Sequence, residues 1–356
     1  MPQALALASK ETAYLIISHP LFVDALGGLV GLQQSRGLQT QVVTTEAIFA
    51  AHSDHQRDAN AIHAFIKATA TQRNSKLRYV LLVGGDGYDY FDILGREALS
   101  LVPTRYAKVG DLINFAPTDV SYGDIDGDGL PDLPVGRIIA RTVDELDAVV
   151  GKLIGYKGGK SALLVTGKSD GAASLPAQHA AMSGSLPGGG WRVSDIAVDN
   201  FPSASDARAS LQKALGTGYP LLSYLGHSDY DYWDFGPLFD RTDIAYMPST
   251  SPAVVTQWAC WNSYFVSVYI ETLAHTLLLT EGNGAASVIG SSTLTDLAAH
   301  NELGRRFFAI LAQGPIALGD ALLRAQRQVG QQFPGMRDDI LAMSLLGDPA
   351  LVVGGP

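Results

Sequence analysis

Cysteine is almost missing from this chain. Cys260 is the only one among 356 residues, which excludes an internal disulfide. Charged residues are also scarce, at 17%, and the acidic ones outnumber the basic ones to leave a net charge of −10. An acidic surface repels phosphates and anionic lipid, so we expect neither nucleic acid nor a membrane as a partner. No apolar run approaches the roughly 20 residues that a membrane-spanning helix needs.

The N-terminal stretch MPQALALASKETAY also lacks a signal peptide's features. It has no basic region followed by a continuous apolar core, which a secretory signal requires. The single cysteine leaves the redox compartment open, so a cytoplasmic location is not excluded. We expect the chain to be an excised part of a longer precursor whose further domains are its partners.

Hydrophobic residues make up 47% of the chain, which is typical of a compact globular protein. Apolar runs that suit strands alternate with segments that suit helices, and several runs are apolar at nearly every position, as strands buried on both faces are. The expected strands are 14–18, 40–45, 79–85, 162–167, 193–198, 220–226, 253–259 and 285–291. The expected helices are 58–71, 143–155, 206–215, 269–279 and 301–313. The alternation predicts an α/β fold with open, mostly parallel sheets covered by helices.

A domain boundary is predicted near GYKGGKS (155–161), where glycine and lysine interrupt the pattern. It divides the chain into an N-terminal α/β subdomain (12–157) that carries acidic loops, and a C-terminal subdomain (160–353). The sequence GGDG (84–87) lacks the spacing of a dinucleotide-binding motif, so we expect no organic cofactor.

Three reactive side chains follow predicted strands. Asp170 comes after 162–167, His227 after 220–226 and Cys260 after 253–259. Groups at the carboxyl ends of parallel strands meet at one edge of the sheet, and a cysteine nucleophile needs a nearby base that a third group orients. The alternative readings are that Cys260 is a small buried hydrophobe and that Asp170 and Gly171 form only a turn.

The loop DIDGDGLPD contains four aspartates, Asp124, Asp126, Asp128 and Asp132, at the first, third, fifth and ninth positions of an EF-hand-like pattern, with Gly129 at the sixth. The twelfth position is Val135 rather than glutamate, so the EF-hand is incomplete. We predict a structural calcium ion here, the alternative being an Asp/Gly turn that leads into a strand.

Several of these segments resemble the gingipain family of cysteine peptidases, which belong to the caspase-like clan. SYLGHSDYDYW around His227 and TQWACWNSYF around Cys260 are similar to the family's histidine and cysteine blocks. YVLLVGGDGYDY, the acidic loop with the segment after it, GNGAASVIGSSTLTD and SLLGDPALVV resemble other blocks in the same order. The resemblance spans about residues 12–353. It implies a caspase-like fold with a catalytic C-terminal subdomain, a protein or peptide substrate, and a bacterial, extracellular or cell-surface location.

The resemblance also implies roles for individual residues. Cys260 would be the nucleophile, His227 the general base and acid, and Asp170 the third member of the site. The backbone N–H groups of Ser228 and Cys260 would form the oxyanion hole. Ser228 and Ser263 stand where the family commonly has glycine, and the acid that selects arginine in some members falls near Pro176.

The substrate pocket has its own candidates. Asp296 lies close to where a lysine-selective relative has its acid, so it is the candidate for selecting a basic side chain. Trp233, Trp258 and Trp261 are expected to line the cleft, the alternative being that they pack in the core.

Three functions compete at this point. The first is an endopeptidase that works through a Cys–His dyad and a thioacyl intermediate. The second is a transpeptidase or processing enzyme of a secretion system, which passes the acyl group to an amine. The third is a catalytically inactive caspase-like module that binds a partner.

Overall fold

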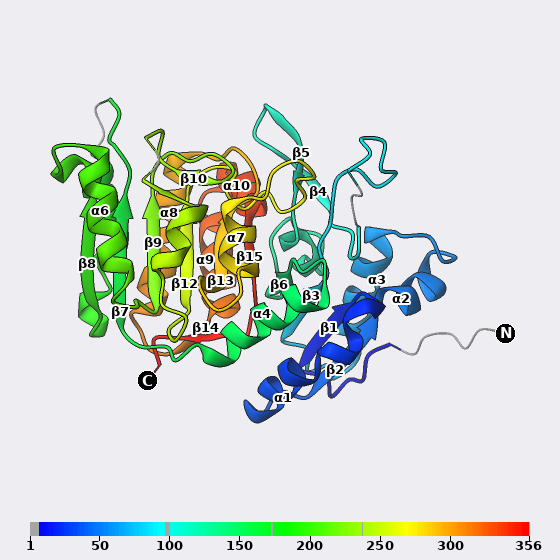
Figure 1. Cartoon of the computed structure of the whole chain (residues 1–356). Coiled ribbons are helices and arrows are strands. Elements are labelled where there is room, and N and C mark those ends of the chain that lie inside the picture. The colour runs from blue at the N-terminus through cyan, green and yellow to red at the C-terminus, as the bar shows by residue number, and fades with distance from the viewer. Residues whose placement is uncertain (1–6, 97–99, 172–173, 237, 356) are drawn as a thin grey trace.

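The computed structural model describes residues 7–96, 100–171, 174–236 and 238–355 (Figure 1). Ten strands form one continuous sheet in the order β2-β1-β3-β6-β15-β13-β12-β9-β7-β8. Neighbouring strands are parallel except β13 and β15, which are antiparallel. Their bounds are β1 Tyr14–Ser18, β2 Thr40–Thr44, β3 Tyr79–Val83, β6 Val135–Ile138, β7 Ser161–Thr166, β8 Arg192–Ala197, β9 Leu221–Leu225, β12 Ala253–Trp258, β13 Ala285–Ser291 and β15 Met343–Leu346. The predicted fold class is confirmed, and all eight predicted strands are present.

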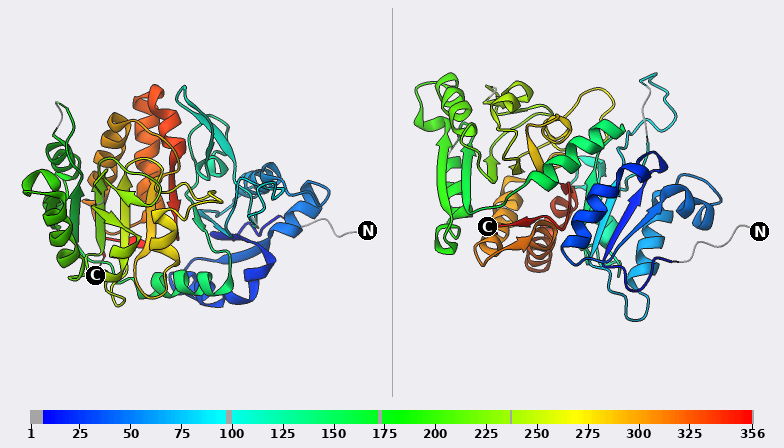
Figure 2. Two further views of the ribbon diagram at one scale, coloured as in Figure 1. Left: turned by 45° about the horizontal axis from the view of Figure 1, so that its top comes forward. Right: turned by 60° about the horizontal axis from the view of Figure 1, so that its bottom comes forward.

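Helices cover both faces of this sheet. One face carries α1 (Gly27–Ser35), α4 (Val143–Gly155), α6 (Ala204–Leu215) and α7 (Leu273–Leu279). The other face carries α2 (Thr45–His52), α3 (Ala59–Ala70), α5 (Leu175–Ser183), α8 (Leu297–Leu311), α9 (Leu318–Gln332) and α10 (Arg337–Ala342). In the left view of Figure 2, α8 and α9, in orange to red, lie across the sheet from α4, in green. Within the described residues, no helix has the length and apolar character that crossing a bilayer requires.

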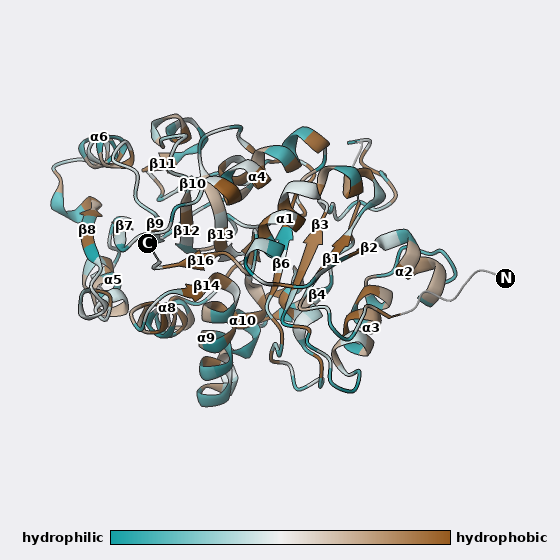
Figure 3. Ribbon diagram, turned by 90° about the horizontal axis from the view of Figure 1, so that it is seen from below, coloured by the Kyte–Doolittle hydropathy of each residue, from teal (hydrophilic) through white to brown (hydrophobic). Residues whose placement is uncertain are grey.

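The apolar runs form central strands because both of their faces are covered. Every residue of β1, β3, β9, β12 and β13 is buried. Side chains alternate between the faces, so in β1 Tyr14 and Ile16 pack with α1 and α4, while Leu15 and Ile17 pack with α2 and α3. In Figure 3, β1 and β3 are hydrophobic, in brown, and the helices beside them mix hydrophobic and hydrophilic residues.

Smaller elements lie outside the main sheet. The hairpin of β4 (Tyr106–Val109) and β5 (Ile113–Pro117) projects beside it, and the pairs β10 (Tyr232–Trp233) with β11 (Phe239–Asp240) and β14 (Ile316–Ala317) with β16 (Val352–Val353) are short. The 3-10 helices are η1 Pro20–Ala25, η2 Val120–Gly123, η3 Pro187–Gly189, η4 Val198–Asn200, η5 Arg241–Tyr246 and η6 Pro334–Met336.

The two parts of the chain meet between β6 and β15. A single register pair, Leu346 with Arg137, joins these strands. Nearby, the buried Asp348 carboxylate accepts hydrogen bonds from Tyr14 at 2.7 Å and Gln33 at 2.7 Å, and it pairs with Arg36 at 3.0 Å. These contacts hold the segment after β15 against β1 and α1. The strands that were expected to form separate sheets in the two subdomains therefore belong to one continuous sheet. The predicted boundary at 157–160 falls between α4 and β7, and the division into subdomains stays a prediction.

Candidate active site

The three predicted catalytic side chains lie at the ends of adjacent strands. Asp170 follows β7, His227 follows β9 and Cys260 follows β12. Strand β9 lies between β7 and β12 and is parallel to both, so the loops after these strands share one edge of the sheet.

Asp170 and His227 are in direct contact. The Nε2 atom of His227 lies 2.8 Å from Oδ2 of Asp170, and the two side chains are 41% and 71% exposed. A carboxylate in this position fixes the orientation of the ring. Because Asp170 occupies Nε2, Nδ1 is the ring nitrogen that remains to exchange protons with another group.

Cys260 is partly exposed, and its thiol lies near Thr295. The Sγ atom lies 3.8 Å from the carbonyl oxygen of Thr295 and 4.0 Å from its Oγ1. The same Oγ1 is 2.8 Å from Nε2 of His300, which is buried. Thr295 follows the strand next to the cysteine strand, but nothing in the sequence distinguished it from its neighbours.

Ser228 connects the histidine loop to the cysteine loop. Its hydroxyl donates a hydrogen bond to the carbonyl oxygen of Cys260. Ser228 also pairs with Trp233 in an isolated bridge, whose hydrogen bonds come from the N–H groups of Asp229 and Asp234. The backbone N–H of Ser228 therefore donates neither of the hydrogen bonds of this bridge. Ser228 is not among the described residues with positive φ, so serine takes this position without backbone strain.

Asp234 joins the histidine loop to the loop that carries Asp170. Its side chain is buried, its Oδ2 accepts the N–H of Lys168 at 2.9 Å, and its own N–H donates to the carbonyl of His227 at 2.8 Å. The hydroxyl of Tyr224 donates to the same carbonyl, and its ring stacks on Trp233 at 4.5 Å. Asp234 holds a left-handed conformation with φ of 66°. Its role depends on contact between two loops, which no sequence motif signalled.

Comparison with known proteins identifies the family to which this chain belongs. A model of peptidase family C25 matches residues 7–354. This chain is a member of peptidase family C25. The family consists of cysteine-type peptidases, so the chain is an enzyme of that type.

Solved structures agree on the fold of this C25 peptidase. Gingipain R, an Arg-specific cysteine proteinase, is 19% identical and covers 97% of this chain and 79% of its own, with a TM-score of 0.80. The complex of the pro- and mature domains of RgpB from Porphyromonas gingivalis is also 19% identical, covering 96% and 79%, with a TM-score of 0.79. Latent dimeric PorU from Porphyromonas gingivalis is 16% identical and covers 97% of this chain but 30% of its own, with a TM-score of 0.51. None of the curated proteins matches the chain.

Two tryptophans of this C25 peptidase do not line a cleft, contrary to expectation. Trp233 and Trp258 are fully buried. The indole N–H of Trp233 donates to Gln257 at 2.8 Å, and that of Trp258 donates to Ser223 at 3.1 Å. Trp258 is buried because it packs against Phe307 and Phe308 of α8. Trp233 is buried because its ring stacks on Tyr224 and Phe239. Trp261 is partly exposed, with its ring 5.5 Å from Tyr230, and it remains a candidate for the cleft.

Asp296 is an exposed residue at the start of a helix. It is the N-cap of α8, where its Oδ1 accepts the N–H groups of Ala298 at 2.6 Å and Ala299 at 3.4 Å. These bonds to Oδ1 stabilise the helix, and selection of a basic substrate side chain by this exposed carboxylate stays a prediction. The helix predicted for 301–313 therefore begins earlier, at Leu297.

The acidic loop of the C25 peptidase gathers three of its four aspartates. Ligand atoms of Asp124, Asp126 and Asp128 lie within 4.8 Å of one another. Asp132 is outside this cluster, because its Oδ1 pairs with Arg327 at 2.6 Å and its Oδ2 accepts the N–H of Ile125 at 2.9 Å. The structure thus groups three of the four predicted ligands, and the role of Asp132 as a fourth stays a prediction.

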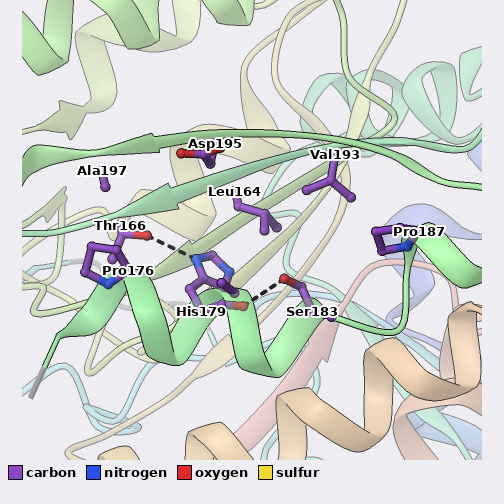
Figure 4. Close-up of a pocket in the computed structure, with 11 residues that line it drawn as sticks. Leu164, Thr166, Pro176, His179, Ser183, Pro187, Val193, Asp195 and Ala197 are labelled. Carbon is purple, nitrogen blue, oxygen red and sulfur yellow. Dashed lines mark hydrogen bonds between the residues drawn. The ribbon is translucent and has the colours of Figure 1, made fainter. Parts of the chain in front are cut away.

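A cavity of about 290 Å³ lies between α5 and the strands β7 and β8. Figure 4 shows His179 pointing from α5 toward these strands. Its Nδ1 is 3.3 Å from Oγ1 of Thr166, its Nε2 is 3.0 Å from Oγ of Ser223, and burial lowers its pKa to about 3. A neutral imidazole bonded to two hydroxyl groups is a structural element, and none of the predicted catalytic residues lines this cavity.

Proposed function

We propose that this chain is an endopeptidase in which Cys260 is the nucleophile and His227 the general base and acid. The observation that carries the proposal is the 2.8 Å contact between Asp170 and His227, at a strand end next to that of Cys260. It gives the histidine an orienting carboxylate and directs proton exchange to Nδ1, as a nucleophile–base–carboxylate arrangement requires.

The reaction would proceed in two halves. His227 takes the thiol proton, and the Cys260 sulfur attacks the carbonyl carbon of the peptide bond. When the C–N bond breaks, the departing amine takes that proton from Nδ1 and leaves a thioacyl enzyme. Water then attacks the thioester with His227 again acting as base, and the C–S bond breaks. Asp170 stabilises the imidazolium in both halves.

The oxyanion of each tetrahedral intermediate needs hydrogen-bond donors near Cys260. We propose the N–H groups of Cys260 and Ser228 for this role. The Ser228 hydroxyl supports the assignment because its bond to the Cys260 carbonyl holds the two backbone segments together.

Alkylation of the thiol tests this proposal without knowledge of the substrate. Iodoacetamide at pH 6–7 should modify Cys260 about ten- to a hundredfold faster than a small free thiol, which is almost entirely protonated there. His227→Ala should reduce the rate to that of the free thiol. His55→Asn, which changes an exposed histidine in another region, is the matched control and should retain the fast rate. A rate equal to that of the free thiol and unchanged by His227→Ala would refute the dyad.

We further propose that Asp124, Asp126 and Asp128 hold a structural calcium ion. Three carboxylates so close together repel one another, and calcium prefers such oxygen ligands. The N–H groups of Gly127 and Gly129 donate to Asp124 at 2.8 and 3.1 Å, which keeps the loop in shape for a cation.

Removing calcium with EDTA should lower the melting temperature by about 5 °C, because an ion bound only to the native state adds a few kcal/mol of stability. Asp126→Asn combined with Asp128→Asn should abolish this shift. Asp111→Asn, at an exposed acid on the β4–β5 hairpin, should leave it intact. Equal melting curves with and without EDTA would count against the ion.

We also propose that the chain acts outside the cell as one domain of a longer precursor. Two related structures support this: one contains separate pro- and mature domains, and PorU is a longer chain of which this fold covers 30%.

A further inference from the structure

A second cavity, of about 400 Å³, lies beside the proposed catalytic histidine. Its walls come from the segments after β7, β8 and β9, including His227 and Asp170. In the sheet, β7 and β8 lie on the side of β9 that faces away from β12, the strand that leads to Cys260. The cavity therefore lies on the side of the histidine strand that is away from the cysteine strand. We call it the leaving-group cavity.

Apolar side chains form much of this cavity. Val198, Phe201, Pro202 and Phe235 contribute carbon surface, while Lys168 and Asp170 stand among its polar residues. The Phe235 ring stacks on the His227 ring with centroids 4.7 Å apart and planes 25° apart, yet its side chain is 73% exposed. An exposed phenylalanine stacked on a catalytic ring offers a substrate apolar surface at the reacting group.

The chemistry of the proposed reaction assigns an occupant to the cavity. The acyl half of the substrate stays bonded to Cys260, whereas the departing amine takes its proton from His227. The residue after the cleaved bond must therefore lie close to the imidazole, which is also part of the wall of the leaving-group cavity.

We infer that the leaving-group cavity binds the side chain of the residue that follows the cleaved bond, and that it selects an aromatic or large aliphatic side chain. The inference rests on the proposed function. A volume of about 400 Å³ falls in the range of roughly 300–1,000 Å³ that binds small organic groups. The carboxylate of Asp170 at the wall disfavours an acidic side chain, and the Lys168 ammonium there is already paired with Asp199 at 2.9 Å.

The same cavity would also receive an acceptor amine in place of water. The amine nitrogen bonds to the thioester carbonyl carbon and the C–S bond breaks. His227 takes a proton from the amine and returns it to the departing thiolate. Phenylalanine amide should consequently intercept the acyl enzyme better than glycine amide, which has no side chain to fill the cavity.

The test uses peptides that share the residues before the cleaved bond, chosen from a cleavage library, and differ in the next residue. Phenylalanine or leucine there should raise kcat/KM about tenfold over glycine, and aspartate should lower it further. Phe201→Ala and Phe235→Ala should reduce the phenylalanine-to-glycine ratio to near one. Phe91→Ala, at an exposed phenylalanine on the loop after β3, is the matched control and should preserve the ratio.

Phe201→Ala is the more informative of the two variants. Phe235 stacks on the His227 ring, so replacing it could also disturb the histidine, whereas Phe201 makes no such stack. The iodoacetamide rate of Cys260 in Phe201→Ala should match that of the unchanged chain, which separates side-chain selection from damage to the dyad. Efficient cleavage with equal rates for phenylalanine, glycine and aspartate, unchanged in both variants, would overturn the inference and leave the proposed function standing. Absence of cleavage of any library peptide would instead refute the proposed function.

Discussion

Cys260→Ala is expected to remove peptide hydrolysis, lowering kcat by about 10⁴-fold or more, because the nucleophile is lost and water alone cannot replace it. The fold should remain, since the Cys260 sulfur is partly exposed and its polar contacts, with Thr295, are as long as 3.8 and 4.0 Å. Cys260→Ser should be nearly as inactive, because a hydroxyl group is far more difficult to ionise than a thiol. The measurement is kcat on a cleaved library peptide, with thermal melting to verify the fold.

Ser263→Ala is the matched control for this loss. It removes a buried hydroxyl from the same segment, and that hydroxyl has no hydrogen-bond partner among the described residues. The variant should melt at the same temperature or higher and should still cleave peptide. Hydrolysis by a folded Cys260→Ala protein at the original rate would eliminate Cys260 as the nucleophile.

Mild acid should destabilise the protein strongly. Burial lowers the pKa of His179 to about 3 and those of His275 and His300 to about 4. Unfolding exposes the three rings to water, where an imidazole has a pKa of about 6.5. The unfolded chain therefore binds more protons below that pH, and the stability that is present above pH 6.5 is lost as the pH falls toward 4.

The expected size follows from linkage. Between pH 7 and pH 5 each buried imidazole should remove about 2 kcal/mol from the free energy of unfolding, or about 6 kcal/mol for all three. Asp86 acts in the opposite direction, because burial raises the pKa of its carboxyl to about 6 and the native state gains stability when it binds a proton. Protonation of Asp86 should add about 1 kcal/mol to the free energy of unfolding between pH 7 and pH 5. The net decrease in the free energy of unfolding should therefore be about 4–5 kcal/mol.

Urea unfolding at pH 7 and pH 5 measures this loss directly. His179→Gln keeps polar atoms near Thr166 and Ser223 but cannot be protonated, so it should shrink the difference between the two pH values by about 2 kcal/mol. His55→Asn should leave the difference unchanged. Imidazole NMR signals of the unchanged chain provide a second readout, in which the three rings should stay neutral at pH 5. Full protonation of these rings in the folded protein at pH 5 would disprove the account.

The sequence predicted the central strands well because runs such as YLIIS and AASVIGS are apolar at nearly every position, which suits a strand covered on both faces. It did not predict α1, α2, α5, α9 or α10. In α1, GGLVGLQQS is rich in glycine, and in α5, LPAQHAAMS contains proline, so neither of these two displays a clear helical stripe. Strand β15 has four residues, and its place between β6 and β13 depends on tertiary contacts.

The candidate site shows the same limit. Its order of strand ends could be predicted, and the structure brings Asp170 to His227. The orientation of individual side chains could not be predicted from the sequence. Trp233 and Trp258 point into the core, and Asp296 caps the N-terminus of α8. That aspartate did carry a sequence signal, since an acid just before an apolar helical segment is a common N-cap. The contact of Asp234 with a loop some 60 residues earlier carried none.

The pairing of β6 with β15 has a consequence for how the protein is made. During synthesis β6 emerges with β3 on one side and an unpaired edge on the other, and the strand that covers this edge emerges only after more than half of the chain has followed. Exposed strand edges pair readily with other chains, so the nascent protein passes through a long interval in which it is prone to aggregate. Chaperone capacity during translation should therefore limit the yield of this peptidase more than the stability of the finished fold does.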